Sequence, residues 1–177
     1  MANERDGEIH WFSPEQRGII PLDGFNISRS LRQTIRKKKF AVRINSNFEA
    51  TIRACAERED VWISETIIQS YLRLHKLGRA HSVECWNNEK LVGGLYGVAI
   101  GGAFFGESMF SRMTDASKVA LIYLVKRMNE RGFILLDVQY STPHLLSLGC
   151  IEIPHLEYMQ RLQKAVQLNC HFMDHHL

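Results

Sequence analysis

Two polar side chains end an apolar run in the second half of the chain. The run at 134–136 is a buried-strand pattern, and Asp137, Val138 and Gln139 follow it. Asp137 and Gln139 are two residues apart, so on a strand their side chains share one face. A carboxylate and an amide at the mouth of an apolar strand suit a site that positions a substrate. The pattern equally fits a structural alternative, in which Asp137 caps the following turn and Gln139 is a buried amide with all its hydrogen bonds made.

A second carboxylate lies inside an apolar stretch. Glu107 is the only charged residue of the segment Phe104-Phe105-Gly106-Glu107-Ser108-Met109-Phe110. A carboxylate among apolar side chains needs a partner, so Glu107 is either half of a buried structural pair or a group that faces a substrate. Ser108 lacks the second glycine of a nucleophile elbow, and the spacing supports no Ser-His-Asp or Cys-His arrangement.

The positive charge of the chain is concentrated in one segment. Residues 28–39 contain six basic side chains and no acid, namely Arg29, Arg32, Arg36, Lys37, Lys38 and Lys39. The whole chain of 177 residues has a net charge of +3, so the remainder sits at −3. A +6 segment on a weakly acidic body indicates a polyanionic partner such as nucleic acid, although a solvated helix face would show the same pattern.

Periodicity and capping residues predict the elements that hold these groups. Typical helix-capping residues stand at Ser28, Asn47, Ser64 and Thr142. Residues 1–14 are predicted to form a short irregular segment before the first element. The predicted helices are 28–38, one after Asn47, one from Ser64 to Gly78, 116–131, a short one after Thr142, and one from Pro154 to about 166. The predicted strands are 41–45, 82–86, 91–100, 103–110, 133–139 and 151–153.

Hairpin strands that precede a β–helix–β crossover predict an α+β, or mixed α/β, fold with a mixed central sheet flanked by helices. Its second half would hold parallel neighbours. Ligands bind beyond the carboxyl ends of such strands, which places the site at the ends of 103–110 and 133–139. We expect one compact domain over 15–168 and a disordered or frayed tail at 169–177.

Composition narrows the class of protein further. A hydrophobic fraction of 45% and a charged fraction of 23% exclude wholesale disorder. The four cysteines are scattered without a Cys-x-x-Cys pair, which fits reduced thiols and a cytoplasmic setting and predicts no metal. His171 and His175 in the tail could bind a metal only if helical. The loop 111–115 lacks the glycine turn that cradles a pyrophosphate, which argues against a CoA-dependent acetyltransferase, and we expect no cofactor.

Four segments resemble bacterial leucyl/phenylalanyl-tRNA–protein transferases. They are FNISRSLR at 25–32, WISETIIQSYLRLHKLGRAHSVECW at 62–86, LVGGLYGVAIGGAFFGESMFSRMTDASKVAL at 91–121, and LLDVQ…LGCIEIP within 135–154. Members of this family have a GNAT-type acyltransferase fold. They move Leu or Phe, and sometimes Met, from aminoacyl-tRNA to the N-terminal Arg or Lys of a protein, which marks that protein for N-end rule degradation.

The resemblance also implies roles for individual residues. Asp137 and Gln139 match the family's catalytic pair, in which Gln139 holds the acceptor's α-amine and Asp137 supports the proton network. The segment 29–39, with its six cations, matches the patch that grips the tRNA acceptor stem. Substrate-binding positions, most of them in an apolar pocket for the donor side chain, match Trp62, Tyr71, Leu95, Phe104, Glu107, Met109, Leu121, Leu124, Met128 and Leu136.

Two departures from the family pattern carry expectations of their own. Asn26 stands where relatives often have a histidine. Residues 1–14 correspond to the remnant of a longer N-terminal segment whose aromatic residues contact the terminal adenosine. An inactive or weakened tRNA-binding short form is therefore the alternative to an active enzyme. The other expectations are a monomer and no membrane partner.

Overall fold

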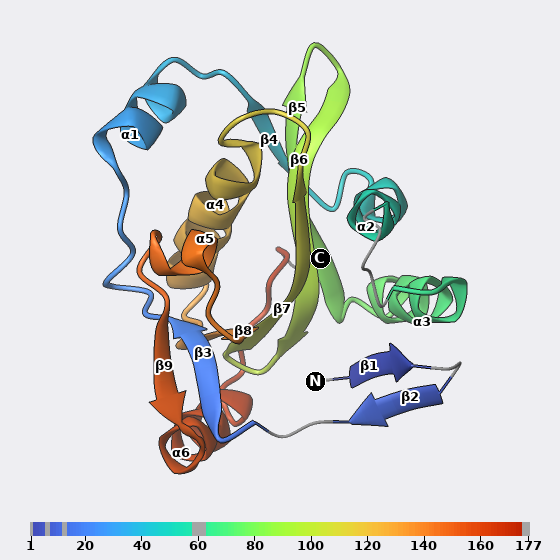
Figure 1. The fold of residues 1–177 in the computed structure, drawn as a ribbon, viewed down its shortest axis with the longest axis vertical. Coiled ribbons are helices and arrows are strands. Elements are labelled where there is room, and N and C mark those ends of the chain that lie inside the picture. Colours follow the sequence, from blue (N-terminus) through green and yellow to red (C-terminus); the bar gives the residue numbers. More distant parts are fainter. Residues whose placement is uncertain (1, 6–7, 12–13, 58–62, 175–177) are drawn as a thin grey trace.

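The computed structural model describes residues 2–5, 8–11, 14–57 and 63–174, with the backbone alone for the first two ranges (Figure 1). The strands are β1 (Ala2–Arg5), β2 (Glu8–Trp11), β3 (Gln16–Ile20), β4 (Ala41–Ile44), β5 (Ala80–Asn87), β6 (Lys90–Ile100), β7 (Ala103–Ser111), β8 (Leu135–Gln139) and β9 (Ile151–Pro154). The helices are α1 (Arg29–Arg36), α2 (Phe48–Ala56), α3 (Glu65–Lys76), α4 (Ala116–Glu130), α5 (Pro143–Leu146) and α6 (His155–Val166).

Seven strands form one mixed sheet in the order β4-β5-β6-β7-β8-β3-β9. β7 and β8 are parallel, and every other neighbouring pair in this sheet is antiparallel. The predicted α+β class with a mixed central sheet flanked by helices is confirmed. The prediction of an irregular lead-in over residues 1–14 is wrong in part, because β1 and β2 pair as a separate two-stranded sheet. The segment after it, β3, lies inside the main sheet between β8 and β9.

Helices cover both faces of the sheet (Figure 1). α1, α4 and α5 lie on one side, where α4 packs over β5 and β6. α2 and α3 lie on the other side, and α6 packs beneath β3, β7 and β8. The alternation along the strands explains this division, since Phe104 and Leu136 belong to the core under α4 whereas Ala103 and Leu135 belong to the core above α6.

The predicted caps are confirmed. The side chains of Ser28, Asn47, Ser64 and Thr142 each accept a hydrogen bond from a backbone N–H in the first turn of their helix. Asp115 also stands at an N-cap, but its backbone has a φ of +72° and its side chain makes no capping bond. Its carboxylate instead accepts a hydrogen bond from Thr34 at 3.1 Å. This contact ties α1 to the start of α4.

One glycine of β6 is needed for the approach of α4. A Cβ at Gly93 would lie 2.4 Å from the Cβ of Ala116, the first residue of the helix. Any larger residue at this position of β6 would push α4 away from the sheet.

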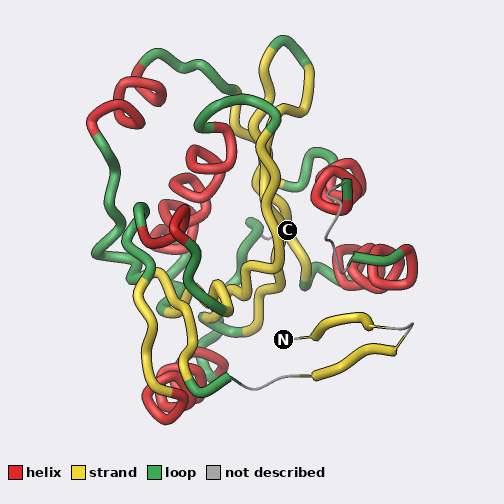
Figure 2. The backbone as a smooth tube through the Cα atoms, in the orientation of Figure 1, coloured by secondary structure: helices red, strands yellow, loops and turns green. Residues whose placement is uncertain are grey.

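The expectation of a frayed tail is wrong for residues 169–174, the part of the tail that the structure describes. Figure 2 shows the segment after α6 as a loop that turns back toward the sheet. Phe172 is only 3% exposed and belongs to the core under α4. An aromatic ring offers a large apolar area for burial, so one such residue suffices to dock a short segment. His175, one half of the suggested histidine pair, lies outside the described residues.

The buried histidine against this tail makes the stability of the fold depend on pH. Burial is the largest cause that lowers the pKa of His81 from 6.5 to about 4, and the charges of His75 and Arg127 act in the same direction. The unfolded chain therefore binds the proton more tightly than the folded chain. Stability should fall by about 3 kcal/mol between pH 6.5 and 4, at about 1.4 kcal/mol for each tenfold change in proton affinity.

Denaturant unfolding between pH 4 and 7.5 measures this effect. We expect His81→Gln to flatten the pH dependence of the free energy of unfolding over that range. His155→Gln, at an exposed position of α6, is the matched control and should leave the dependence as in the parent protein. An unchanged slope in His81→Gln would contradict the assignment.

Candidate active site

The site lies where two parallel strands separate. β7 and β8 pair only at Ala103–Leu135, Phe104–Leu136 and Phe105–Asp137. Directly after this point each strand contains a bulge. Gly97 of β6 pairs with Gly106, and the residue before it, Tyr96, pairs with Ser108, so Glu107 is passed over in the pairing with β6. On β8, Val138 is passed over in the same way by β3. Bulges re-aim side chains beside active sites.

The two bulged segments bring Glu107 and Gln139 together. The Gln139 amide Nε2 donates to the Glu107 carboxylate at 3.1 Å, so a hydrogen bond bridges the strands just beyond their last backbone pair. Tyr71 of α3 also hydrogen-bonds the Glu107 side chain. Glu107 therefore has polar partners from two elements, α3 and β8, just beyond the last backbone pair of the two parallel strands.

The environment of Glu107 disfavours its charge. Burial is the largest cause that raises the pKa of this carboxyl, and the nearby charge of Asp137 acts in the same direction. The hydrogen bonds from Tyr71 and Gln139 oppose the shift without cancelling it. Burial and the Glu107 charge raise the pKa of the Tyr71 phenol in turn. The Tyr71 hydroxyl is thus a stable hydrogen-bond donor to Glu107 across the neutral pH range.

Asp137 is held by three groups from three places in the chain. Its carboxylate is fully buried and forms an ion pair with Arg17 of β3, with Nη2 2.7 Å from Oδ2 and Nε 3.0 Å from Oδ1. The Tyr158 hydroxyl of α6 donates to Oδ2 at 2.6 Å. The backbone N–H of Gln139 donates to Oδ1 at 2.7 Å. Both carboxylate oxygens therefore have charged or polar donors.

The contact with Asp137 also changes the pKa values of its partners. Burial and the hydrogen bond to Asp137 raise the pKa of the Tyr158 phenol. Burial acts to lower the pKa of Arg17, but the hydrogen bond and charge of Asp137 outweigh it and raise the value. Tyr158 and Arg17 are therefore fixed donors, and the protein holds Asp137 as the acceptor of a buried network. Removing one partner of such a pair is strongly destabilising.

The backbone at Gln139 is strained. Its φ is +71°, and the Tyr140 N–H donates to the Val138 carbonyl at 2.9 Å, which makes Gln139 the centre of a tight γ-turn. A Cβ at Gly18 of β3 would lie 2.7 Å from the backbone of Tyr140, so this turn requires a glycine on the neighbouring strand. Strain of this kind costs about 1–3 kcal/mol and occurs at functional sites. Here the Asp137 carboxylate holds the turn by its bond to the Gln139 N–H.

The predicted donor-pocket positions are core residues in this structure. Six of them belong to the apolar cluster under α4, and none is more than 3% exposed, namely Leu95, Phe104, Leu121, Leu124, Met128 and Leu136. Met109 is partly buried against the same cluster. Trp62 lies outside the described residues. The structure thus brings the six positions together between the sheet and α4, with their side chains packed on one another.

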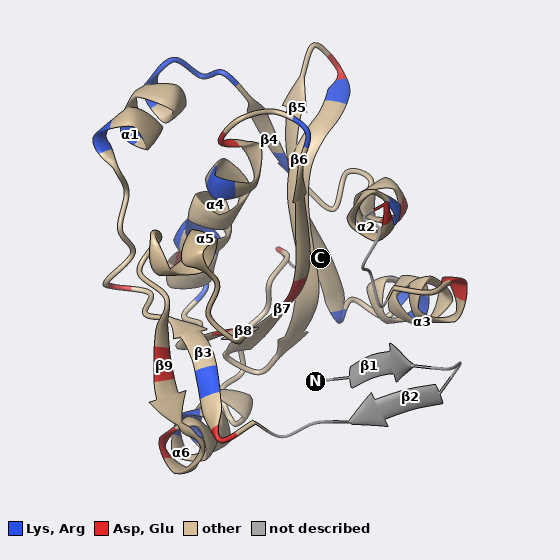
Figure 3. Cartoon of the chain, in the orientation of Figure 1, with Lys and Arg blue, Asp and Glu red and all other residues tan. Residues whose placement is uncertain are grey.

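The six basic residues lie on one exposed strip. Arg29, Arg32 and Arg36 are on α1, and the three lysines continue from its C-cap toward β4 (Figure 3). Leu31 anchors α1 to the core at 2% exposure. Within the described part of the chain, none of the six forms an ion pair with an acid. The strip is therefore an uncompensated cationic surface.

Comparison with known proteins assigns the chain to a family. The profile of the leucyl/phenylalanyl-tRNA protein transferases matches residues 19–163. A protein of that name from Cereibacter sphaeroides is 57% identical over 167 residues, which are 94% of this chain and 78% of the relative. Another from Chlorobaculum tepidum is 54% identical over 170 residues, 94% of this chain and 88% of the relative.

The chain belongs to the leucyl/phenylalanyl-tRNA–protein transferase family. Among solved structures, that of L-PGS from Bacillus licheniformis aligns with a TM-score of 0.48 at 15% identity, and the alignment covers 75% of this chain and 47% of that one.

Two residues of the site in this family member, Arg17 and Tyr158, were not predicted from the sequence. Arg17 and Tyr158 contact Asp137, yet they lie far from it along the chain. A signal existed for Arg17, since it is the one charged residue beside the apolar Gly18-Ile19-Ile20 segment, and a buried carboxylate needs a cation. Tyr158 lies in an amphipathic helix like many others, and nothing in its spacing distinguishes it.

No group of three side chains able to hold a metal ion is found within the described ranges. No helix in the described part of the chain is both long and apolar enough to cross a bilayer. A cavity of about 520 Å³ lies between α2 and the start of β6, lined by Arg53, Glu57, Leu91 and Arg112 among others. It contains none of the predicted site residues.

The strain at Gln139 predicts an order of stability for two variants of this residue. Gln139→Gly and Gln139→Ala both lose the side-chain bond to Glu107. Only the alanine variant keeps the cost of about 1–2 kcal/mol that an L side chain incurs at a positive φ, so Gln139→Gly should be the more stable of the two. Thermal unfolding of both variants gives the order. A glycine variant that is less stable than the alanine variant would contradict the strain.

Proposed function

We propose that this protein transfers leucine or phenylalanine from aminoacyl-tRNA to the N-terminal Arg or Lys of acceptor proteins. The observation that carries the proposal is the identity of 54–57% to proteins of that name over most of both chains. The acceptor class, the marking of the product for N-end rule degradation, a cytoplasmic location and a monomeric state are parts of the same proposal. They rest on the resemblance described above.

The geometry at Gln139 supports amine positioning. Its Nε2 is engaged by Glu107, and in the described part of the chain no hydrogen bond to its Oε1 is present. An amide oxygen accepts N–H groups, so Oε1 would hold the α-amine of the acceptor. The two atoms that react would then be the acceptor's amine nitrogen, held at Gln139, and the carbonyl carbon of the donor ester.

The reaction needs little acid–base assistance. An α-amine has a pKa of about 7.7–8.0, so a useful fraction is neutral near pH 7. The aminoacyl ester is an activated donor, and the tRNA ribose leaves as its hydroxyl. Holding amine and ester in an attack geometry supplies the main acceleration. A covalent enzyme intermediate is unnecessary on this scheme.

Asp137 is best assigned as a positioning residue. Its oxygens are occupied by Arg17, Tyr158 and the Gln139 N–H, so a proton transfer to Asp137 would have to disrupt a buried ion pair. Its bond to the Gln139 backbone instead fixes the strained turn that aims the amide. This role replaces a direct place for Asp137 in the proton network, and it adds Arg17 and Tyr158 as further positioning residues.

The proposed activity has a direct test. The protein is incubated with tRNA charged with radiolabelled phenylalanine and a peptide that begins with Arg. We expect label on the peptide, and none on the same peptide with an acetylated N-terminus. Binding of the charged tRNA without transfer would overturn the proposal in favour of a tRNA-binding form without activity.

The positioning network makes a separate prediction. Tyr158→Phe removes one donor to Asp137 and leaves the ring in place, and a hydrogen bond to a charged group is worth about 1.5–3 kcal/mol. We expect kcat to fall about 10- to 100-fold with little change in KM for the charged tRNA. Steady-state kinetics at saturating peptide measures both. Tyr123→Phe, on the outer side of α4 at 36% exposure, is the control and should retain the parental kcat.

The six cations of the strip are proposed to bind the tRNA acceptor stem. Each phosphate contact contributes about −0.7 to −0.9 to the slope of log K against log salt concentration. Arg36→Gln combined with Lys37→Gln should therefore weaken tRNA binding and reduce the steepness of that slope by about 1–2. Lys164→Gln, an exposed cation of α6, should leave the slope unchanged. Equal effects of both changes would exclude a specific tRNA strip.

A further inference from the structure

The tail after α6 is fastened to the end of α4 by side chains. The Arg127 Nε donates to the Phe172 carbonyl at 2.9 Å, and Asp174 forms ion pairs with Arg127 and Arg131. The Cys170 thiol donates to the Gly132 carbonyl at 3.2 Å. The described tail residues after α6 therefore hold their place without belonging to a helix or a strand.

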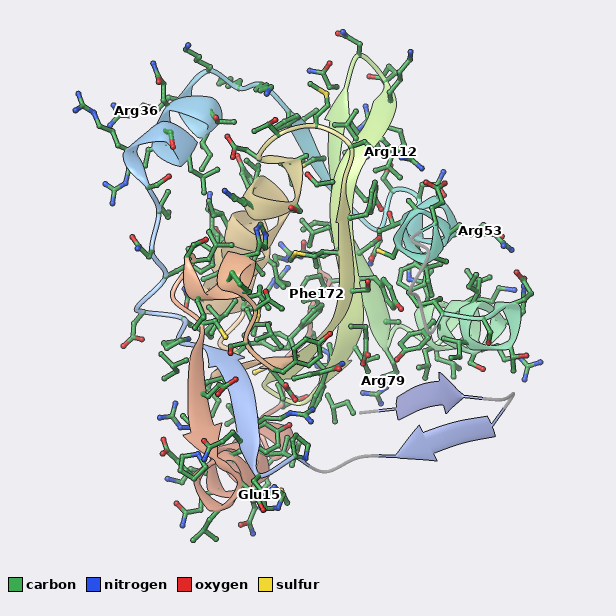
Figure 4. The ribbon with its side chains drawn as sticks, viewed as in Figure 1. Glu15, Arg36, Arg53, Arg79, Arg112 and Phe172 are labelled. Carbon is green, nitrogen blue, oxygen red and sulfur yellow. The ribbon has the colours of Figure 1, made fainter. Side chains whose placement is uncertain are left out.

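These contacts insert the ring of Phe172 between the sheet and α4 (Figure 4). Its centroid lies 4.5 Å from that of His81 in a stacked pair, 5.2 Å from Phe104, and 6.1 Å from Phe133 in an edge-on pair. His81 pairs with Gly97 across β5 and β6, and a Cβ at Gly97 would lie 2.5 Å from the Phe104 ring. The absent side chain at Gly97 thus gives Phe104 the room to lie beside His81 under Phe172.

This ring lies next to the proposed donor pocket. Phe104 pairs with Leu136, one register step before the Phe105–Asp137 pair where the strands separate. Phe172 belongs to the same apolar cluster as the six proposed pocket positions. The amine-positioning group Gln139 stands at the end of β8, whereas Phe172 contacts Phe104 near the start of β7 and Phe133 just before β8. Phe172 therefore packs at the end of this cluster that lies away from Gln139.

A donor side chain can enter this space only if a side chain within it moves. The six pocket positions are at most 3% exposed, and protein interiors are packed without spare volume for a leucine or phenylalanine side chain. All six lie on strands or helices that backbone hydrogen bonds hold. Phe172 lies on a segment held by side chains of α4 and one thiol bond. Compared with the six pocket positions, its ring can therefore move with less disturbance of the sheet and α4.

We propose that Phe172 is a specificity-determining residue that forms the adjustable inner wall of the donor pocket. Its ring sets the upper size of the side chain that the enzyme transfers, and the clamp of Arg127 and Arg131 on Asp174 sets how far the ring can withdraw. The inference rests on the proposed function, since it names a further residue of that same site. Its ligand class is the aliphatic or aromatic side chain of an aminoacyl-tRNA.

The experiment measures kcat/KM for tRNA charged with leucine, phenylalanine and tryptophan. One missing or added methylene in an apolar pocket changes discrimination about 10- to 200-fold. Phe172→Leu should therefore raise the ratio of tryptophan to leucine transfer at least about tenfold. Phe172→Trp should lower the ratio of phenylalanine to leucine transfer by a similar factor.

The matched control is Phe48→Leu, which removes the same ring atoms from a buried position of α2 in the other apolar cluster. It should lower the melting temperature as Phe172→Leu does, and leave both donor ratios at the parental values. A purely structural Phe172 would lower transfer of all donors together. Donor ratios within twofold of the parent in both folded Phe172 variants would overturn the inference.

A parent protein that transfers none of the three amino acids would instead overturn the proposed function. The two failures are thus distinguished by the parent alone. Asp174→Asn supplies a milder variant that leaves the Phe172 ring intact and loosens the clamp, and it should shift the tryptophan to leucine ratio in the same direction as Phe172→Leu. A parental ratio in Asp174→Asn would show that the ion pairs do not restrain the ring and would overturn that part of the inference.

Discussion

The buried charge of Asp137 is the constraint on which the arrangement of the site depends. A carboxylate without exposed surface is stable only when a cation and further donors replace its water. β8 cannot provide them, because its own residues before Asp137 are apolar. The cation comes from Arg17, which requires β3 to lie beside β8, and the hydroxyl comes from Tyr158, which requires α6 beneath the sheet. One ionic group thereby fixes the place of an N-terminal strand and a C-terminal helix.

The strained turn at Gln139 follows from the same network. A positive φ at a residue with a side chain is unfavourable, and the Asp137 bond to the Gln139 N–H offsets part of that cost. Gly18 on β3 leaves the space that the backbone of Tyr140 occupies. The bulge at Glu107 then places a carboxylate opposite the turn. The geometry of one amide thus depends on three strands, β3, β7 and β8.

Local features of the fold were predictable, and long-range ones were not. The caps at Ser28 and Asn47 could be identified from the sequence because a cap involves only neighbouring residues. The contact between Asp137 and Gln139 is also local, but it joins the Asp137 carboxylate to the Gln139 backbone N–H, as in the alternative in which Asp137 caps a turn. The ion pair to Arg17 joins residues 120 positions apart, and no local period encodes it. The buried tail was missed because a single Phe172 gives no periodic signal, although it docks the whole segment.

Two carboxylates beside one amide have opposite environments, and this difference separates their roles. Asp137 meets a guanidinium, a phenol and a backbone N–H, whereas Glu107 meets neutral donors in a buried setting that raises its pKa. Pairs of titratable groups whose surroundings differ in this way commonly divide the work of a site. Asp137 is the acceptor of a buried network that contains a cation. Glu107 has neutral groups as its described hydrogen-bond partners, and burial raises its pKa.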